Sequence, residues 1–106
     1  MKAILINIVD RTVTEHETIG TLQEWYRLID CDQVQVGCYL NSYGDLLLVD
    51  EEGKFKNNPP HWFTYEGCPY NLFSNGLVVG VSKDGDTISP AVSLTEVKAA
   101  VKFYSR

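Results

Sequence analysis

Residues 34–50, VQVGCYLNSYGDLLLVD, contain the clearest strand pattern in the chain. Apolar side chains alternate with other residues along the first half, at Val34, Val36, Cys38 and Leu40. This alternation predicts a β-strand with one buried face, on which Cys38 is a core thiol. The polar residues 41–44 predict a turn, and residues 45–50 predict a second strand that returns beside the first.

The sequence before this pair predicts a hairpin and a helix. Residues 3–9 are an Ile-rich apolar run, and residues 12–18 alternate β-branched and polar side chains, so each segment predicts a strand. The sequence Thr21-Leu22-Gln23-Glu24 matches a capping box at a helix start. The helix should end near Asp30, and its apolar stripe is predicted at Leu22, Trp25, Tyr26 and Ile29.

The sequence after the pair predicts turns at 51–54 and 83–86, with a strand at 77–81 between them. A second capping box at 93–96 predicts a terminal helix, whose apolar face would contain Leu94, Val97, Val101 and Tyr104. The predicted order is ββα, ββ, a long loop and βα. Strands that do not alternate regularly with helices favour an α+β fold with a mainly antiparallel sheet and two helices packed on it. We expect residues 1–106 to form a single domain.

Charge and cysteine content restrict the classes of partner. The chain has 14 acidic and 9 basic residues, a net charge of −5, without a basic cluster, so we expect no DNA binding. The apolar run at the start is too short for a signal peptide or a membrane span, so we expect no membrane association. Three cysteines fit a reducing compartment better than a disulfide framework. These features predict a cytoplasmic protein.

Local motifs for catalysis or metal binding are not recognisable. Cys31 and Cys38 are seven residues apart, as are His61 and Cys68, whereas structural zinc sites use closely spaced pairs. Residues 80–85 have the two glycines of a phosphate-binding loop, but Asp86 stands where that loop needs lysine. We therefore predict no metal, no cofactor and no catalytic residues.

The candidate binding region is the aperiodic segment 57–76, which is long for a loop in a compact domain. It holds five of the chain's twelve aromatic residues: Trp62, Phe63, Tyr65, Tyr70 and Phe73. We add Asn57, Asn58 and His61 as candidate polar contacts. Two interpretations stay open: the rings fill the core, or some remain exposed as a binding surface.

Several turn and strand sequences together resemble one family. They are MKAILI at the start, LLVDEEGK at 47–54 followed by Asn58-Pro59-Pro60, GLVVG at 76–80 and DGDT at 84–87. The chain resembles, over most of its length, a family of small domains of unknown function common in bacteriophages and bacterial mobile elements. The resemblance implies a phage-type accessory protein in a bacterial cytoplasm, and it carries over no catalytic residue.

These observations lead to three functional hypotheses. The first is a non-enzymatic accessory protein that binds a host or phage macromolecule, most simply a protein, in host takeover or counter-defence. The second is a binder that sequesters a nucleotide-type ligand, because aromatic rings stack on bases and turn amides hold phosphate. A homo-oligomer would be able to place Lys54, Lys56 or Arg27 of one chain beside the rings of another. The third is an uncharacterised enzyme that uses His61.

Overall fold

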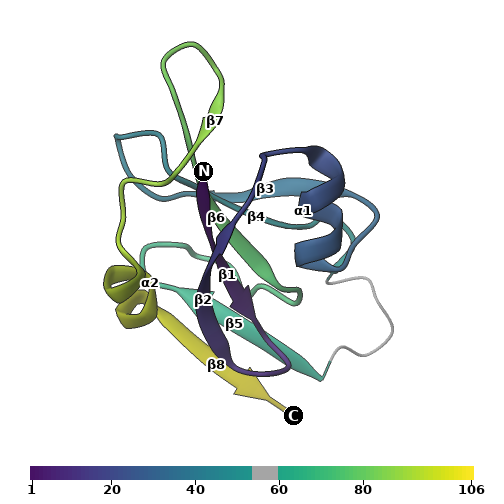
Figure 1. The fold of residues 1–106 in the computed structure, drawn as a ribbon. Coiled ribbons are helices and arrows are strands. Elements are labelled where there is room, and N and C mark those ends of the chain that lie inside the picture. Colours follow the sequence, from purple (N-terminus) through teal and green to yellow (C-terminus); the bar gives the residue numbers. More distant parts are fainter. Residues whose placement is uncertain (54–59) are drawn as a thin grey trace.

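The computed structural model describes residues 1–53 and 60–106 (Figure 1). It confirms the predicted α+β class, with two helices and a mainly antiparallel main sheet. In chain order the elements are β1 (Lys2–Asn7), β2 (Thr12–Glu17), α1 (Leu22–Ile29), β3 (Val34–Tyr39), β4 (Leu46–Asp50), β5 (His61–Tyr65), β6 (Gly76–Val81), β7 (Thr87–Ile88), α2 (Leu94–Ala100) and β8 (Val101–Ser105). Neither helix in the described part of the chain is long and apolar enough to cross a bilayer.

The main sheet has the strand order β2-β1-β6-β4-β3, and β7 extends it by pairing with β6. The predicted hairpin is present as β1 and β2, and β3 and β4 form the second antiparallel pair. The late strand β6 lies between β1 and β4, so it joins these two pairs into one sheet. β6 is apolar and almost fully buried, as expected for the central strand of a sheet covered on both faces.

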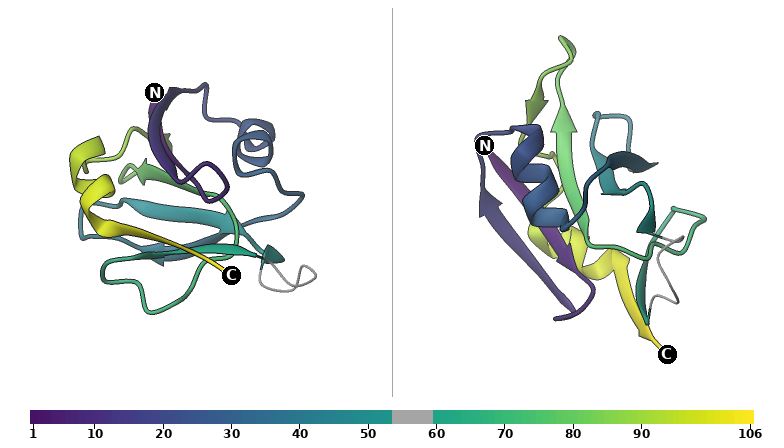
Figure 2. Two further views of the ribbon diagram at one scale, coloured as in Figure 1. Left: turned by 90° about the horizontal axis from the view of Figure 1, so that it is seen from below. Right: turned by 90° about the vertical axis from the view of Figure 1, so that its right-hand side faces the viewer.

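Alternate residues of β1 point to opposite faces of the main sheet. Ala3 and Leu5 pack in a cluster with Trp25 and Ile29 of α1. The other cluster contains Ile4 and Ile6 of β1, together with apolar residues from β5 and α2. The fold is therefore layered, with α1 on one face of the main sheet and the β5–β8 pair with α2 on the other (Figure 2).

The pair formed by β5 and β8 corrects two predictions. Part of segment 57–76 is not a loop but a strand, and the terminal helix ends at Ala100 instead of continuing to Tyr104. Val101 caps the helix with extended backbone angles and begins β8 directly. The chain leaves the helix because residues two apart, Val101 and Phe103, can then both pack against the core.

Strand β3 also differs from its prediction, because it does not keep one buried face. A register shift between Val36 and Cys38 inserts Gly37 as an extra residue, which is a β-bulge. Val34 therefore packs with the α1 cluster, whereas Cys38 and Leu40 pack with the opposite cluster. A Cβ atom at position 37 would lie 3.0 Å from Val49 Cγ2, so glycine lets the bulge pack closely against β4.

The start of α1 forms half of the predicted capping box. The Thr21 hydroxyl accepts the Glu24 N–H at 3.3 Å, but the Glu24 carboxylate bonds the Thr18 hydroxyl and the Ile19 N–H. The Thr18 hydrogen bond is the main reason that the pKa of Glu24 is lowered. The buried residues of α1 are Trp25, Leu28 and Ile29, whereas the predicted stripe residue Leu22 is 54% exposed. The capping box at α2 is complete.

A buried carboxylate connects the β3–β4 turn to the segment before α2. Asp45 is 2% exposed. Its Oδ1 accepts the Ala91 N–H at 2.8 Å, and its Oδ2 accepts the Val92 N–H at 2.9 Å and the Asn41 amide at 2.9 Å. Both oxygens are thus used, which is the condition under which a carboxylate can be buried at tolerable cost.

Replacement of this carboxylate is our first test of the fold. In Asp45→Asn one end of the side chain becomes an NH2 donor, and either orientation points it at a backbone N–H. We expect the free energy of unfolding, measured by urea denaturation, to fall by about 2 kcal/mol. Asp84→Asn, in the exposed turn after β6, is the matched control and should change it little. Equal stability of the two variants would contradict the role given to Asp45.

Tyr65 in the core and the partly buried Cys38 that packs against the core predict a loss of stability at alkaline pH. Burial, with the neighbouring Cys68 thiol, raises the pKa of Cys38 from 9.0 to about 11. Burial also raises the pKa of Tyr65. The unfolded chain therefore gives up these protons at lower pH than the folded chain does, so stability is complete below about pH 9 and falls as pH rises toward 11.

The measurement is the free energy of unfolding between pH 7 and 11 at constant ionic strength. Cys38→Ala and Tyr65→Phe should each flatten the decline above pH 9, because each removes one of the shifted groups. An unchanged decline in the double variant would show that other groups cause it.

Candidate functional site

The alternation of β5 separates the predicted binding aromatics into two groups. Phe63 is 0% exposed and Tyr65 is buried, and both belong to the core cluster beneath the main sheet. A Cβ atom at Gly76 would lie 2.7 Å from the Phe63 ring, so the ring fills the space that this glycine leaves. The expectation that Phe63 and Tyr65 contribute to a binding surface is therefore corrected, because their side chains are needed inside.

The outward face of the same strand carries a group of three rings. Trp62 stacks on Tyr104 of β8, with ring centroids 5.7 Å apart and planes inclined by 10°. Trp62 also contacts Phe73 at 5.9 Å in a tilted arrangement. Trp62 and Phe73 are half-buried, and Tyr104 is 40% exposed. We call these three residues the aromatic surface.

Tyr104 is not among the predicted site residues, because the sequence predicts it on the apolar face of a terminal helix. The signal that identifies it is the alternation in VKFYS at 101–105, in which Val101 and Phe103 are apolar and Lys102 and Tyr104 are amphipathic. The register pairs Trp62 with Tyr104 directly, and a direct cross-strand pair places two side chains on the same face.

His61 lies at the end of β5, on the face of the strand opposite to Trp62. Its Nδ1 is 3.2 Å from the Ser105 hydroxyl, and the Arg11 guanidinium also donates to that hydroxyl. Catalytic serine–histidine pairs use a further group that orients the imidazole. Among the described residues, the His61 ring is hydrogen-bonded to Ser105, and no carboxylate is hydrogen-bonded to the ring. The geometry fits a surface polar contact better than an activated nucleophile.

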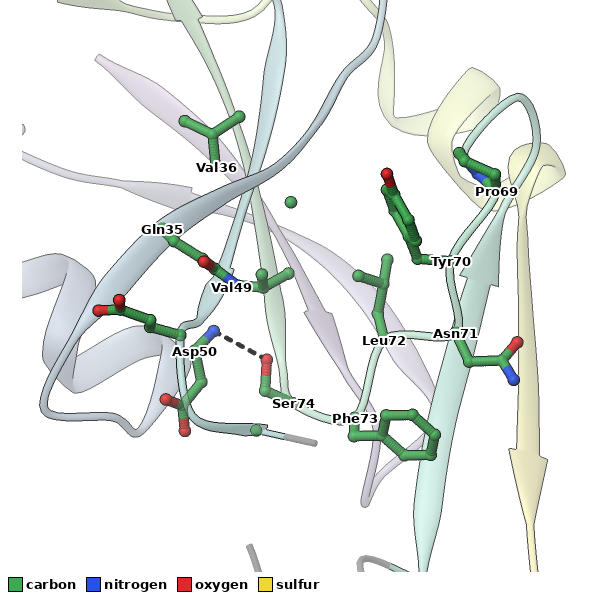
Figure 3. Close-up of a pocket in the computed structure, with 13 residues that line it drawn as sticks. Gln35, Val36, Val49, Asp50, Pro69, Tyr70, Asn71, Leu72, Phe73 and Ser74 are labelled. Atoms are coloured by element: carbon green, nitrogen blue, oxygen red, sulfur yellow. Dashed lines mark hydrogen bonds between the residues drawn. The ribbon is translucent and has the colours of Figure 1, made fainter. Parts of the chain in front are cut away.

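A cleft of about 550 Å³ adjoins the aromatic surface (Figure 3). One wall is formed by β3 and the end of β4, and the other by residues 69–74. Val49 and Leu72 form its apolar floor, and Tyr70, 62% exposed, stands on the second wall. Phe73 lines the cleft and also contacts Trp62, so the cleft and the aromatic surface are continuous.

The charge of the cleft is negative. Glu51 is exposed at its rim, and the lining residues that the structure describes include no lysine or arginine. Asp50 also belongs to the lining, but its carboxylate is buried and its Oδ1 accepts the Glu52 N–H at 2.9 Å. The Asp50 N–H donates to Ser74 at 3.0 Å, which ties the end of β4 to the opposite wall (Figure 3). The cleft is therefore better suited to a neutral or cationic group than to a phosphate.

The candidate metal ligands do not assemble. Cys38 and Cys68 are neighbours that pack on one face of the main sheet, whereas Cys31 packs on the other. In residues 1–53 and 60–106, no three side chains of His, Cys, Asp or Glu come together as a metal site would need.

The structure therefore brings together three of the eight predicted site residues, Trp62, Tyr70 and Phe73, whereas His61 lies on the opposite face of β5. Phe63 and Tyr65 lie in the core, and Asn57 and Asn58 lie outside the described residues. Comparison of the chain with protein-family models, curated proteins and solved structures gave no match.

Proposed function

We propose that this protein is a non-catalytic binding module that recognises a partner protein through the aromatic surface. The observation that carries the proposal is the Trp62–Tyr104 stack on the outward face of the β5–β8 pair. Rings held in place by stacking lose little conformational freedom on binding, and the parts of them that remain exposed are available for burial against a partner. Tryptophan and tyrosine are also the residues in which binding energy is most often concentrated at protein interfaces.

The surroundings of these rings suit a protein partner. The exposed basic residue Lys102 lies on the same face of β8 as Tyr104. The cleft on the other side of Phe73 is acidic. A surface with both signs of charge around an apolar centre matches the usual anatomy of a protein interface, with its polar rim.

The setting that we propose is that of a phage-type accessory protein that binds a host or phage macromolecule in a bacterial cytoplasm. This part of the proposal rests on the sequence resemblance.

The cleft supports one alternative function, a small-molecule site. Its volume of about 550 Å³ is typical of ligand pockets, which are on the order of 300–1,000 Å³. The exposed Glu51 would repel the phosphates of a nucleotide, so the charge argues against the nucleotide-type ligand expected from the sequence. An uncharged or cationic ligand fits the lining better.

Truncation of the aromatic surface tests the main proposal. Tagged protein is used to recover partners from a bacterial lysate, and the recovered protein is quantified for each variant. We expect Trp62→Ala and Tyr104→Ala to lower recovery about tenfold or more, because a central aromatic contact contributes at least about 1.4 kcal/mol to binding. Tyr43→Ala, at a tyrosine exposed on the β3–β4 turn, is the matched control and should recover the wild-type amount.

Stability measurements separate binding from folding in this experiment. Trp62→Ala should lower the free energy of unfolding by about 1 kcal/mol, whereas Phe63→Ala should lower it by about 4 kcal/mol because it opens a core cavity. Equal recovery of the same proteins by wild type and Trp62→Ala would reject the proposal. So would a failure to recover any protein specifically.

A further inference from the structure

The two outer edges of the main sheet are chemically different. β2 lies at one end and carries Glu15 and Glu17. Charged residues on an edge strand discourage pairing with another strand. β3 lies at the other end, and its sequence VQVGCY contains neither a charged residue nor proline. Of these two edges, β3 is thus the one without side chains that oppose strand addition.

The hydrogen-bond pattern shows which backbone groups β3 presents outward. Glu51 donates its N–H to the Gln33 carbonyl at 2.9 Å. In an antiparallel pair, hydrogen-bonded positions alternate, so Gln35 is bonded to Val49 and the N–H and C=O groups of Val34 and Val36 point away from β4. Val36 is 40% exposed. No strand that the structure describes pairs with this edge.

The acidic cleft lies beside this edge. Gln35, Val36 and Gly37 of β3 belong to its lining. Across the cleft, the Leu72 N–H and C=O both bond Phe63 at 2.9 Å, which holds the second wall against β5. A strand added to β3 would therefore direct alternate side chains into the cleft, where the exposed Glu51 favours a positive charge.

We propose that an extended segment of the partner protein pairs with Val34–Val36 through backbone hydrogen bonds and places a lysine or arginine in the cleft. This inference rests on the proposed function, and it identifies the class of partner. Backbone bonds to a sheet edge supply affinity in such complexes, and side-chain pockets supply specificity. A second copy of this chain is the less suitable occupant, because two chains of net charge −5 would meet with both acidic clefts at the contact.

The test begins with a selection of displayed random ten-residue peptides on immobilised wild-type protein. The enriched peptides should share alternating β-branched residues around a lysine or arginine. The best of them is synthesised with a fluorescent label, and its Kd is measured by fluorescence anisotropy. Against wild type, Val36→Pro should weaken binding about tenfold, since it removes one outward N–H donor. Val36→Thr keeps that donor and should bind within about threefold.

Two further measurements make the result independent of how well Val36→Pro folds. Two versions of the same peptide are made, one with N-methyl groups on the backbone nitrogens of its even-numbered residues and the other with them on its odd-numbered residues. One version should bind wild type as the parent peptide does, and the other about tenfold more weakly, because only alternate N–H groups of the added strand face β3. Glu51→Lys should weaken binding of the basic peptide and spare a variant peptide with glutamate at that position.

Three results would contradict the strand addition. The inference is overturned if no peptide is enriched, or if the enriched peptides bind Val36→Pro and both methylated forms as tightly as the parent. It is also overturned if wild type forms a dimer that Val36→Pro converts to a monomer, because the edge would then belong to a second copy. If these tests fail while Trp62→Ala still loses its partner, the aromatic surface remains and only the strand addition is rejected.

Discussion

The Asp45 carboxylate joins the start of β4 to the segment that leads into α2. It sits where β4 begins, and it bonds the two consecutive backbone N–H groups of Ala91 and Val92. Helix α2 starts two residues later, and β8 follows α2 without an intervening loop. The position of β8 therefore depends on this contact as well as on the packing of Val97 of α2 in the core. Because β8 is the strand on which β5 pairs, so does the stacking of Trp62 on Tyr104.

Local patterns predicted the parts of the fold that short segments determine. The β1–β2 hairpin, the β3–β4 pair and the starts of both helices follow from alternation, turn residues and capping sequences, and the structure contains all of them. Strand β8 was missed because VKFYS continues the helical spacing of the preceding residues equally well. Its strand conformation is decided by pairing with β5, which lies about forty residues earlier in the chain. A local sequence pattern does not reveal such a long-range pairing.

The candidate site was predicted only in part, because long-range strand pairing also decides which side chains it contains. The aromatic content of segment 57–76 identified the right region, and Trp62, Tyr70 and Phe73 do line its surface or cleft. Which rings face outward depends on the strand phase of β5, and this phase is fixed by the pairing of Phe63 with Phe103. The cleft itself combines β3, β4 and residues 69–74, so its acidic lining is visible only once these segments are brought together.

The β-bulge at Gly37 has a consequence for the solubility of the protein. An uncharged edge strand is a template on which chains can stack into fibrils, provided that its ladder of backbone groups is continuous. The extra residue interrupts that ladder after Val36 and increases the local twist. The continuous ladder before the bulge is therefore limited to Val34–Val36, a short template for an intermolecular sheet.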